Sequence, residues 1–445
     1  MPFQTPVLSL DQVLQQRRDR LAQLHPDPVV LWSGQPVSRN FPANTYPFRA
    51  NSHFLYFGGV PLSKAAIHLE GGRLTLFMDD TSAEAALWHG PSPSRDTIAA
   101  TMGAIAAYPY TDLDRHLHEV ATLPAQSHHH PDRSAALVKA LVDLRLYHDD
   151  YALDQISLAA AVSVAAHRAG MAATPVAPTE AAVRAAMEQV IVGQGMTCAY
   201  NSIVTVHGEV LHNDQYHHPL HPGDLLLADV GAETPSGWAS DITRTWPVSG
   251  RFSPTQRDIY TVVLAAHDAC IAAMGPGVEY RDLHLLACRT LTAGLVDLGL
   301  LKGHPDDLVD RDVHALFFPH GVGHLLGLDV HDMEDLGDVA GYAPGRQRSD
   351  RFGLKFLRLD RPLATNMVVT IEPGFYQVPA ILAPAQQSGA YDDAVNWSRL
   401  ADFQDVRGIR IEDDVQVTAT GSQVLTAALP TLPDAVEDLV RSSPN

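Results

Sequence analysis

Five side chains that can bind metal ions stand far apart in the chain, each inside a short, apolar, strand-like segment. In chain order they are Asp229, Asp241, His324, Glu372 and Glu412. A carboxylate in an apolar strand is costly unless it is paired or bound to a metal ion. Four carboxylates and one imidazole form an oxygen-rich ligand set, which suits two divalent ions of the manganese or cobalt type better than one structural zinc ion. The sequence therefore predicts one shared dinuclear metal site.

The first two acids have the spacing of a β-hairpin. Asp229 and Asp241 are twelve residues apart (241 minus 229), and a Pro-Ser-Gly turn lies between them. Counted inward from the turn, the two carboxylates are expected to face each other across the hairpin, where side chains approach closely. They would repel each other unless a cation lay between them. On spacing alone, two unrelated acids at strand ends or turns are an equal alternative.

The segments around these ligands resemble the pita-bread metallopeptidase family, and within it the proline-specific branch of Xaa-Pro aminopeptidases (aminopeptidase P) and Xaa-Pro dipeptidases (prolidases). The strings that carry the resemblance are YNSIV (200–204), LLLADVGAE, SDITRTWPV, FFPHGVGHLLGLDVHD, VVTIEPGFY and GIRIEDDV. Upstream, YPFRANSHFLYFGG (46–59) is similar to the family's N-terminal domain. The resemblance covers nearly the whole chain. It implies an α/β N-terminal domain followed by an α+β pita-bread catalytic domain.

The resemblance also implies how the five ligands would divide between two metal ions, with manganese expected and cobalt or zinc possible alternatives. Asp241 and Glu412 would bridge the ions, Asp229 would chelate the first, and His324 with Glu372 would complete the second. A hydroxide held between the ions would attack the carbonyl before proline. Glu372 would act as the proton shuttle. The expected substrates are small peptides with proline at the second position.

Three further histidines match positions in the family's motifs. By resemblance, His212 helps to hold the substrate near the metal ions, His331 donates to the developing oxyanion, and His320 forms a wall of the proline pocket. A histidine without such a context is more often an ordinary core residue. The resemblance also indicates residues that bind substrate or support the ligands, with Arg410 orienting a ligand carboxylate: Tyr200, Tyr376 and Arg410, and less specifically Thr243.

Two activities within the branch differ in whether the proline carboxylate of the substrate is free. A dipeptidase must bind that carboxylate, and arginine is suited to a bidentate grip. The string GLKFLR places Arg358 where prolidases carry such an arginine, and the long intervals 331–372 and 372–412 are also similar to prolidases. In contrast, Trp88 and the N-terminal string are more similar to aminopeptidase P. We predict a dipeptidase, with an aminopeptidase as the alternative and a non-catalytic binding module as a remote one.

Composition limits the partners of the chain. Its 445 residues suffice for two domains, and 51 acidic against 31 basic residues give a formal charge of −20, which argues against nucleic acid or an anionic membrane as a partner. Three cysteines without CxxC spacing fit a reducing, cytoplasmic location, and neither a signal peptide nor a long apolar run is apparent. A homodimer is expected by resemblance. We interpret SHHHPD (127–132) and His217–His218 as polar loops rather than metal sites.

The elements that must position the ligands can be read from periodicity. Strands are expected at VVLWSG and LTLFMDD, and amphipathic helices at LDQVLQQRRDRLAQL and SAALVKALVDLRLYH, which together make an α/β domain over residues 1–150. Its role would be dimerisation or substrate access. The catalytic domain is predicted over 151–445, with long helices at 153–171, after Thr179, from Pro254 behind a Ser253 N-cap, and at 280–298.

Overall fold

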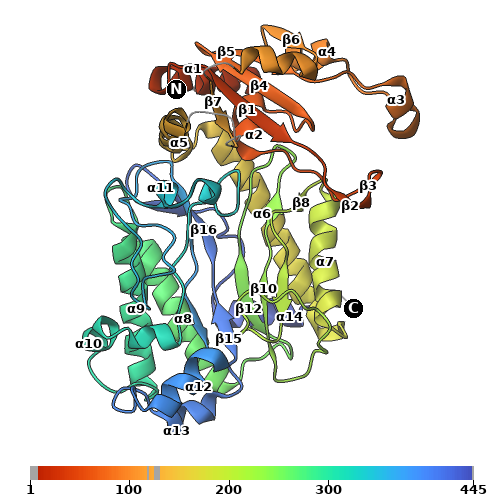
Figure 1. The fold of residues 1–445 in the computed structure, drawn as a ribbon. Coiled ribbons are helices and arrows are strands. Elements are labelled where there is room, and N and C mark those ends of the chain that lie inside the picture. The colour runs from red at the N-terminus through yellow and green to blue at the C-terminus, as the bar shows by residue number, and fades with distance from the viewer. Residues whose placement is uncertain (1–8, 118–119, 125–130, 443–445) are drawn as a thin grey trace, which may run out of the picture. The chain divides into compact units, whose positions relative to one another are not determined.

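The computed structural model describes residues 9–117, 120–124 and 131–442, with the side chains of 131–133 left out. These residues form two compact units. The first comprises Met1–Leu146 and Pro235–Gly237, and the second comprises Tyr147–Thr234 and Trp238–Asn445 (Figure 1). The chain thus passes from one unit to the other between Leu146 and Tyr147 and returns briefly at residues 235–237.

The first unit is built on a mixed five-stranded sheet in the order β6-β5-β4-β1-β7. Strand β1 pairs antiparallel with β4 and parallel with β7, and helices α1, α2 and α5 pack against the sheet and each other. The predicted α1 begins with the capping box of Ser9 and Gln12. The elements are α1 (Leu10–Leu24), β1 (Val29–Gly34), β2 (Ser38–Phe41), β3 (Asn44–Thr45), α2 (Ser52–Gly58), β4 (Ala65–Glu70), β5 (Arg73–Phe77), α3 (Ala83–His89), α4 (Arg95–Thr101), β6 (Ala106–Tyr108), β7 (Ala121–Leu123) and α5 (Pro131–Arg145).

The second unit places several small antiparallel sheets between pairs of long helices (Figure 1). Helices α6 and α7 pack together on one side of the strands, and α8 packs with α9 on the other. Its elements up to α9 are α6 (Asp150–Ala173), α7 (Glu180–Gly193), β8 (Thr197–Cys198), β9 (Ile203–Thr205), β10 (Leu225–Asp229), β11 (Ala232–Glu233), β12 (Thr243–Pro247), α8 (Pro254–Ala273) and α9 (Tyr280–Asp297). The rest are α10 (Pro305–Asp310), α11 (Asp338–Gly341), β13 (Val368–Ile371), β14 (Gly374–Tyr376), α12 (Pro379–Ser388), α13 (Trp397–Leu400), β15 (Gly408–Arg410), β16 (Asp413–Val417), β17 (Ser422–Val424) and α14 (Pro433–Arg441).

Helix α8 shows how local sequence sets the start of a helix. The capping box of α8 forms as expected: Ser253 Oγ accepts from the backbone N–H of Gln256 at 3.1 Å, and Gln256 Oε1 accepts from Ser253 N–H at 3.0 Å.

Helix α6 is long and apolar enough to span a membrane by length and composition. However, 56% of its most apolar window is buried inside the protein, as in the core helix of a globular domain. It packs on α7 and β11.

The hairpin that carries the first two acids differs in register from the prediction. Asp229, at the end of β10, pairs with Thr243 of β12, so Asp241 lies two residues further along and diagonally across from Asp229. The hairpin continues in the same register beyond this pair: Val230 N–H donates to the Ile242 carbonyl, Ser240 N–H donates to the Ala232 carbonyl, and β11 pairs with β8 on its other side. At Gly231 the backbone of this connection lies so close to Ser240 that a Cβ atom would sit 1.8 Å from the Ser240 carbonyl oxygen.

We expect Gly231→Ala to destabilise the second unit by about 1–3 kcal/mol, the usual range for overpacking a close contact. The added methyl group would push apart the two segments that carry Asp229 and Asp241. Thermal unfolding and bound-metal content, measured after reconstitution, should both decrease. The matched control is Gly193→Ala at the end of α7, where a Cβ atom would meet nothing within 4 Å. A Gly231→Ala protein as stable and as rich in metal as the control would contradict the packing argument.

Candidate metal centre

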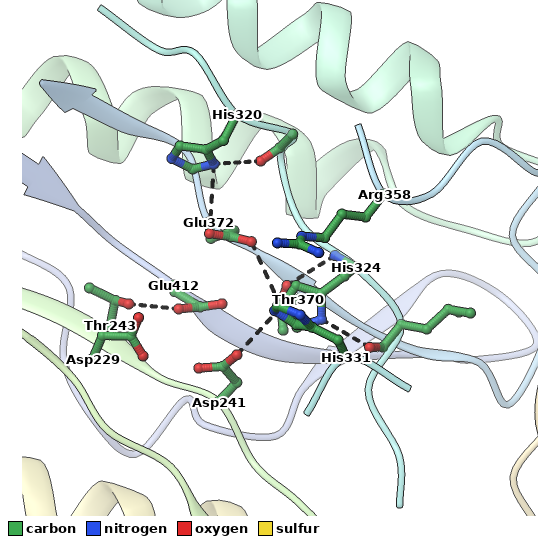
Figure 2. Close-up of polar contacts among 12 residues, drawn as sticks. Asp229, Asp241, Thr243, His320, His324, His331, Arg358, Thr370, Glu372 and Glu412 are labelled. Atoms are coloured by element: carbon green, nitrogen blue, oxygen red, sulfur yellow. Dashed lines mark hydrogen bonds and ion pairs between the residues drawn. The ribbon is translucent and has the colours of Figure 1, made fainter. Parts of the chain in front are cut away.

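The structure brings the five predicted ligands to one cavity of about 90 Å³ (Figure 2). Asp229 ends β10, Asp241 precedes β12, Glu372 lies between β13 and β14, and Glu412 lies between β15 and β16. His324 lies in the irregular segment before α11, where the backbone of Leu325 forms a bridge to Val369 of β13. The ligand atoms of Asp241, His324 and Glu412 lie within 4.8 Å of one another.

Three carboxylates of this cluster resist ionisation in the absence of a cation. Burial, and then the charge of Asp229, raises the pKa of Asp241 to about 8. Burial raises the pKa of Glu372 to about 7, and burial together with Asp241 raises the pKa of Glu412 well above its usual range. A divalent cation would remove this penalty by compensating the charges. The cluster therefore has the electrostatics of a metal site.

The orientation of His324 also indicates a metal site. Its Nδ1 lies 2.9 Å from the carbonyl oxygen of Leu325, which can only accept, so Nδ1 carries the hydrogen. Burial lowers the pKa of His324, which keeps the ring neutral. The lone pair of Nε2 then faces carboxylate oxygens of Asp241 at 3.4 Å and Glu372 at 3.8 Å (Figure 2). Acceptors that face one another around a cavity fit a cation, and this donor set fits two divalent ions.

A chain of hydrogen bonds holds the ligands from behind. Arg410 is buried, and its Nη2 donates to Asp229 Oδ2 at 2.6 Å while its Nε donates to Thr243 Oγ1 at 2.9 Å. The hydroxyl of Thr243 in turn donates to Glu412 Oε2 at 2.6 Å (Figure 2). Arg410 and Thr243 thus fix two ligand carboxylates at once, as expected for residues that orient metal ligands.

The same arginine reaches the predicted wall of the proline pocket. Its Nη1 donates to the Tyr376 hydroxyl at 3.1 Å, and that hydroxyl lies 2.9 Å from His320 Nε2. His320 Nδ1 donates to the carbonyl of Gly321 at 2.8 Å, so Nε2 is free to accept from Tyr376. Burial, and then Arg410, lowers the pKa of His320 to about 3, so its ring is neutral.

Tyr200, which we predicted on the substrate side, lies directly against two of the metal ligands. Its hydroxyl is 2.6 Å from Asp229 Oδ1 and 2.5 Å from Asp241 Oδ1. Burial, followed by the charges of Asp229 and Asp241, raises its pKa well above the usual range, so it keeps its proton. A hydroxyl has one proton to donate, so it stabilises one aspartate at a time.

The remaining predicted residues line the open side of the cavity. They are His212, His331 and Arg358, and Figure 2 shows the Arg358 side chain extending toward the acidic cluster. The ring of His331 stacks edge-on against His324, with centroids 4.2 Å apart. Burial, and then His324, lowers the pKa of His331. Its Nδ1 donates to Glu334 Oε2 at 3.0 Å.

Three charged residues that the sequence analysis did not single out support the site. Asp414 Oδ1 accepts from the backbone N–H of Asp241 at 3.0 Å and so fixes that ligand's main chain. Arg244 donates to the Glu412 carbonyl at 2.6 Å and to Asp413 at 2.8 Å. Glu334 accepts from both His331 and Arg358. The run of three acids, Glu412 to Asp414, was a visible signal for Asp414; Glu334 had none.

Other histidines and cysteines of interest are not part of this cavity. His218 Nδ1 pairs with Glu180 at 2.9 Å, and its ring stacks on His217 and His207. The histidines of SHHHPD lie outside the described residues. Trp88 is 75% exposed on α3.

A buried group of His284, Cys288 and His314 could also surround an ion, but the His284 nitrogen 3.6 Å from the Cys288 sulfur already bonds to the Gly353 carbonyl at 2.8 Å. We assign no metal ion to it.

We expect the stability of metal-depleted protein to decrease as the pH rises from about 4 to about 8. In this range the folded state keeps protons on Asp241 and Glu372, because their pKa values are raised to about 8 and about 7, while the unfolded chain has already lost them. Metal ions bind the deprotonated ligands, so added Mn²⁺ should raise the melting temperature more at pH 8 than at pH 5. Asp241→Asn should reduce that difference. An equal shift at both pH values would contradict the assignment.

Comparisons with known proteins agree with this geometry. The model of metallopeptidase family M24 matches residues 154–419, and the model of the aminopeptidase P N-terminal domain matches residues 14–128. A probable Xaa-Pro aminopeptidase of Fusarium vanettenii is 32% identical over 419 residues, which cover 89% of this chain and 87% of that protein.

Solved structures are similar along almost the whole chain. The aminopeptidase PepP of Pseudomonas aeruginosa has 30% identity and a TM-score of 0.80, covering 98% of this chain and 99% of that one. Aminopeptidase P from E. coli, solved with the inhibitor Pro-Leu, has 26% identity and a TM-score of 0.81, with the same coverage of each chain. The predicted fold, an α/β N-terminal domain followed by a pita-bread catalytic domain, is confirmed. The chain belongs to metallopeptidase family M24.

Proposed function

We propose that this metallopeptidase is an Xaa-Pro aminopeptidase, which releases the N-terminal residue from peptides whose second residue is proline. The observation that carries the proposal is the match of both parts of the chain to aminopeptidase P, in sequence relatives and in solved structures of almost the same length. The five converging ligands support catalysis rather than binding alone, since a non-catalytic module has no need of a cluster of costly buried carboxylates.

An aminopeptidase was the alternative prediction from the sequence, and a dipeptidase was the main one. We had preferred a dipeptidase because of Arg358 and two long intervals between motifs. The relatives and neighbours that cover the whole chain are named Xaa-Pro aminopeptidases or aminopeptidase P. In addition, Arg358 is already paired with Glu334 and so is not a free receptor for a carboxylate. The cytoplasmic location and the homodimer stay predictions.

In the proposed enzyme the metal ions are held by the five ligands, Asp229, Asp241, His324, Glu372 and Glu412. Two divalent ions would supply an activated water molecule and stabilise negative charge on the substrate carbonyl. Manganese fits this donor set, as do cobalt and zinc. Thr243, Arg410 and Tyr200 keep the ligand carboxylates in place through the hydrogen bonds described above.

Glu372 is suited to move a proton during the reaction. Its carboxylate lines the cavity beside His324 and His320, so it can reach a water molecule held by the metal ions and accept a proton from it. In the proposed mechanism its carboxylate takes a proton from the attacking water and passes it to the proline nitrogen as that nitrogen leaves. Proline has no N–H, so the substrate must be recognised by shape and by its carbonyl groups. His320 and Tyr376, held by Arg410, form one side of the site.

His212 and His331 are positioned at the open side of the cavity to contact the substrate. Since the Nδ1–H of His331 is directed to Glu334, its Nε2 faces away from that carboxylate. A donor role for Nε2 toward the oxyanion requires a second proton on the ring. Burial and His324 lower the pKa of His331, whereas the negative charges of Glu334 and of the oxyanion favour that proton. His212 lines the cavity and is exposed, so it can bond to the substrate backbone.

The proposal is tested by comparing the hydrolysis of Ala-Pro-Ala and Ala-Pro by the Mn²⁺-loaded protein, with a chelated sample as the control. We expect release of alanine from the tripeptide with a higher kcat/KM than from the dipeptide, and loss of both activities on chelation. Cleavage of the dipeptide alone would instead identify a prolidase. Activity on neither peptide, with metal bound, would leave a metal-dependent hydrolase of another specificity.

We expect His331→Ala to lower kcat for Ala-Pro-Ala by about 10²–10³, the usual loss on removing one oxyanion donor, with little change in KM. The metal content should be unchanged, because His331 is not among the five ligands. His217→Ala, at an exposed histidine away from the cavity, is the control and should keep the activity of the unmodified protein. A KM increase at constant kcat would refute the proposed role of His331 and assign it to ground-state binding.

A further inference from the structure

Arg358 lies between two neighbouring cavities of the second unit. It lines the cavity that contains the predicted metal ligands, and it also lines a second cavity of about 120 Å³, which shares His324 and His331 with the first. Glu334 lines the second cavity but not the first. The guanidinium that could bind a substrate carboxylate is therefore held by an acid that lies outside the cavity of the metal ligands.

The two oxygens of the Glu334 carboxylate have different partners. Oε1 accepts from Arg358 Nη1, and Oε2 accepts from His331 Nδ1 at 3.0 Å. An exposed ion pair contributes little to stability. Here, however, one carboxylate joins two residues that line the site, so its effect is on their charge and orientation. The positive charge of Arg358 is compensated before any substrate arrives.

The backbone keeps this pair together. Glu334 follows Met333, whose φ of +61° lies in the left-handed region, and it begins a short 3-10 helix that ends at Leu336. Residues 341–342 then run beside 357–360: Asp360 N–H donates to the Gly341 carbonyl at 2.9 Å, and the Tyr342 hydroxyl donates to the Leu357 carbonyl at 2.7 Å. A Cβ atom on Gly341 would lie 2.1 Å from the Arg358 carbonyl oxygen, so the two segments are in close contact.

The compensated charge has a consequence for substrates of different length. An Xaa-Pro dipeptide carries a free carboxylate on its proline, and it would have to compete with Glu334 for Arg358. A longer peptide has a neutral amide at the same place, which can accept one hydrogen bond from Arg358 without displacing Glu334. Discrimination of this kind acts by disfavouring the wrong substrate rather than by binding the right one more tightly.

We propose that Glu334 is a specificity-determining residue, which neutralises Arg358 and thereby directs the site to peptides longer than Xaa-Pro. The inference rests on the proposed aminopeptidase function and gives a reason for its substrate class. Glu334 acts through Arg358 and His331 and has no direct contact with the reacting atoms.

The test compares Ala-Pro with Ala-Pro-amide, which differ only in the charge of the terminal group. The Mn²⁺-loaded Glu334→Gln variant keeps a carbonyl oxygen to accept from His331 but loses the negative charge. We expect its kcat/KM for Ala-Pro, relative to Ala-Pro-amide, to rise by about tenfold, mainly through a lower KM for Ala-Pro. Any loss of orientation at His331 should lower kcat for both compounds equally.

Two further variants separate this effect from a general change in charge. Asp338→Asn removes one negative charge from the same region, where Asp338 pairs with Arg348, which does not line the cavity of the metal ligands. It should leave the ratio unchanged. The double variant Glu334→Gln/Arg358→Gln should lose the gain in kcat/KM for Ala-Pro, because it no longer has the guanidinium that Glu334→Gln alone releases. If the ratio rises in the double variant too, or equally in Asp338→Asn, the proposal is wrong.

Failure of this inference is distinguishable from failure of the proposed function. If the unmodified enzyme cleaves Ala-Pro-Ala better than Ala-Pro but Glu334→Gln has the same ratio, only the role of Glu334 is refuted. If the unmodified enzyme prefers Ala-Pro, the aminopeptidase proposal itself fails. If Glu334→Gln turns over too slowly to assay, calorimetry can measure the binding of Ala-Pro and of Ala-Pro-amide to the metal-loaded variant. We then expect the affinity for Ala-Pro, relative to that for Ala-Pro-amide, to rise by about tenfold over the unmodified protein. An unchanged ratio of affinities overturns the proposal.

Discussion

Repulsion among buried carboxylates is the constraint on which the second unit depends. Asp229, Asp241, Glu372 and Glu412 share one cavity, and within the part of the chain that the structure describes only two arginines line it. One of these, Arg358, is occupied by Glu334, so Arg410 alone offsets the acidic charge from behind. A protein can keep such a cluster only if protons or cations complete it. The small sheets and their flanking helices provide a rigid frame that holds these acids together despite that cost.

Arg410 connects two parts of the site that have different tasks. On one side it holds Asp229 and Thr243, and on the other it holds Tyr376 and, through it, His320. Metal ligation and the wall proposed for the proline pocket therefore depend on the position of a single guanidinium. Its planar shape and fixed set of donors explain why lysine could not replace it, since an ammonium group could not hold these partners in separate directions.

The sequence was sufficient for the ligand segments, because each is a short apolar string around one polar residue. It was also sufficient for α8, whose capping box is a local signal. It was insufficient for the hairpin register, because moving the centre of the turn by one residue moves the pairing by two, and the turn is centred on Ser236 rather than on Pro235. It also indicated Arg358, which lines the cavity, but not its partner, because Glu334 follows no periodicity and meets Arg358 only through the folded backbone. The preference for a dipeptidase rested partly on Arg358 taken without that partner and partly on the two long intervals between motifs.

The backbone contacts around Asp241 have a consequence for how the protein folds. Asp241 N–H bonds to Asp414, and Glu412 N–H bonds to the Thr243 carbonyl, so segments about 170 residues apart in sequence meet at the ligands. Such contacts of high sequence separation form late, since the chain between them must first be ordered. In a growing chain the first two aspartates are therefore made long before their partners. The centre can close only after the C-terminal segment that carries Glu412 and Asp414 has been made.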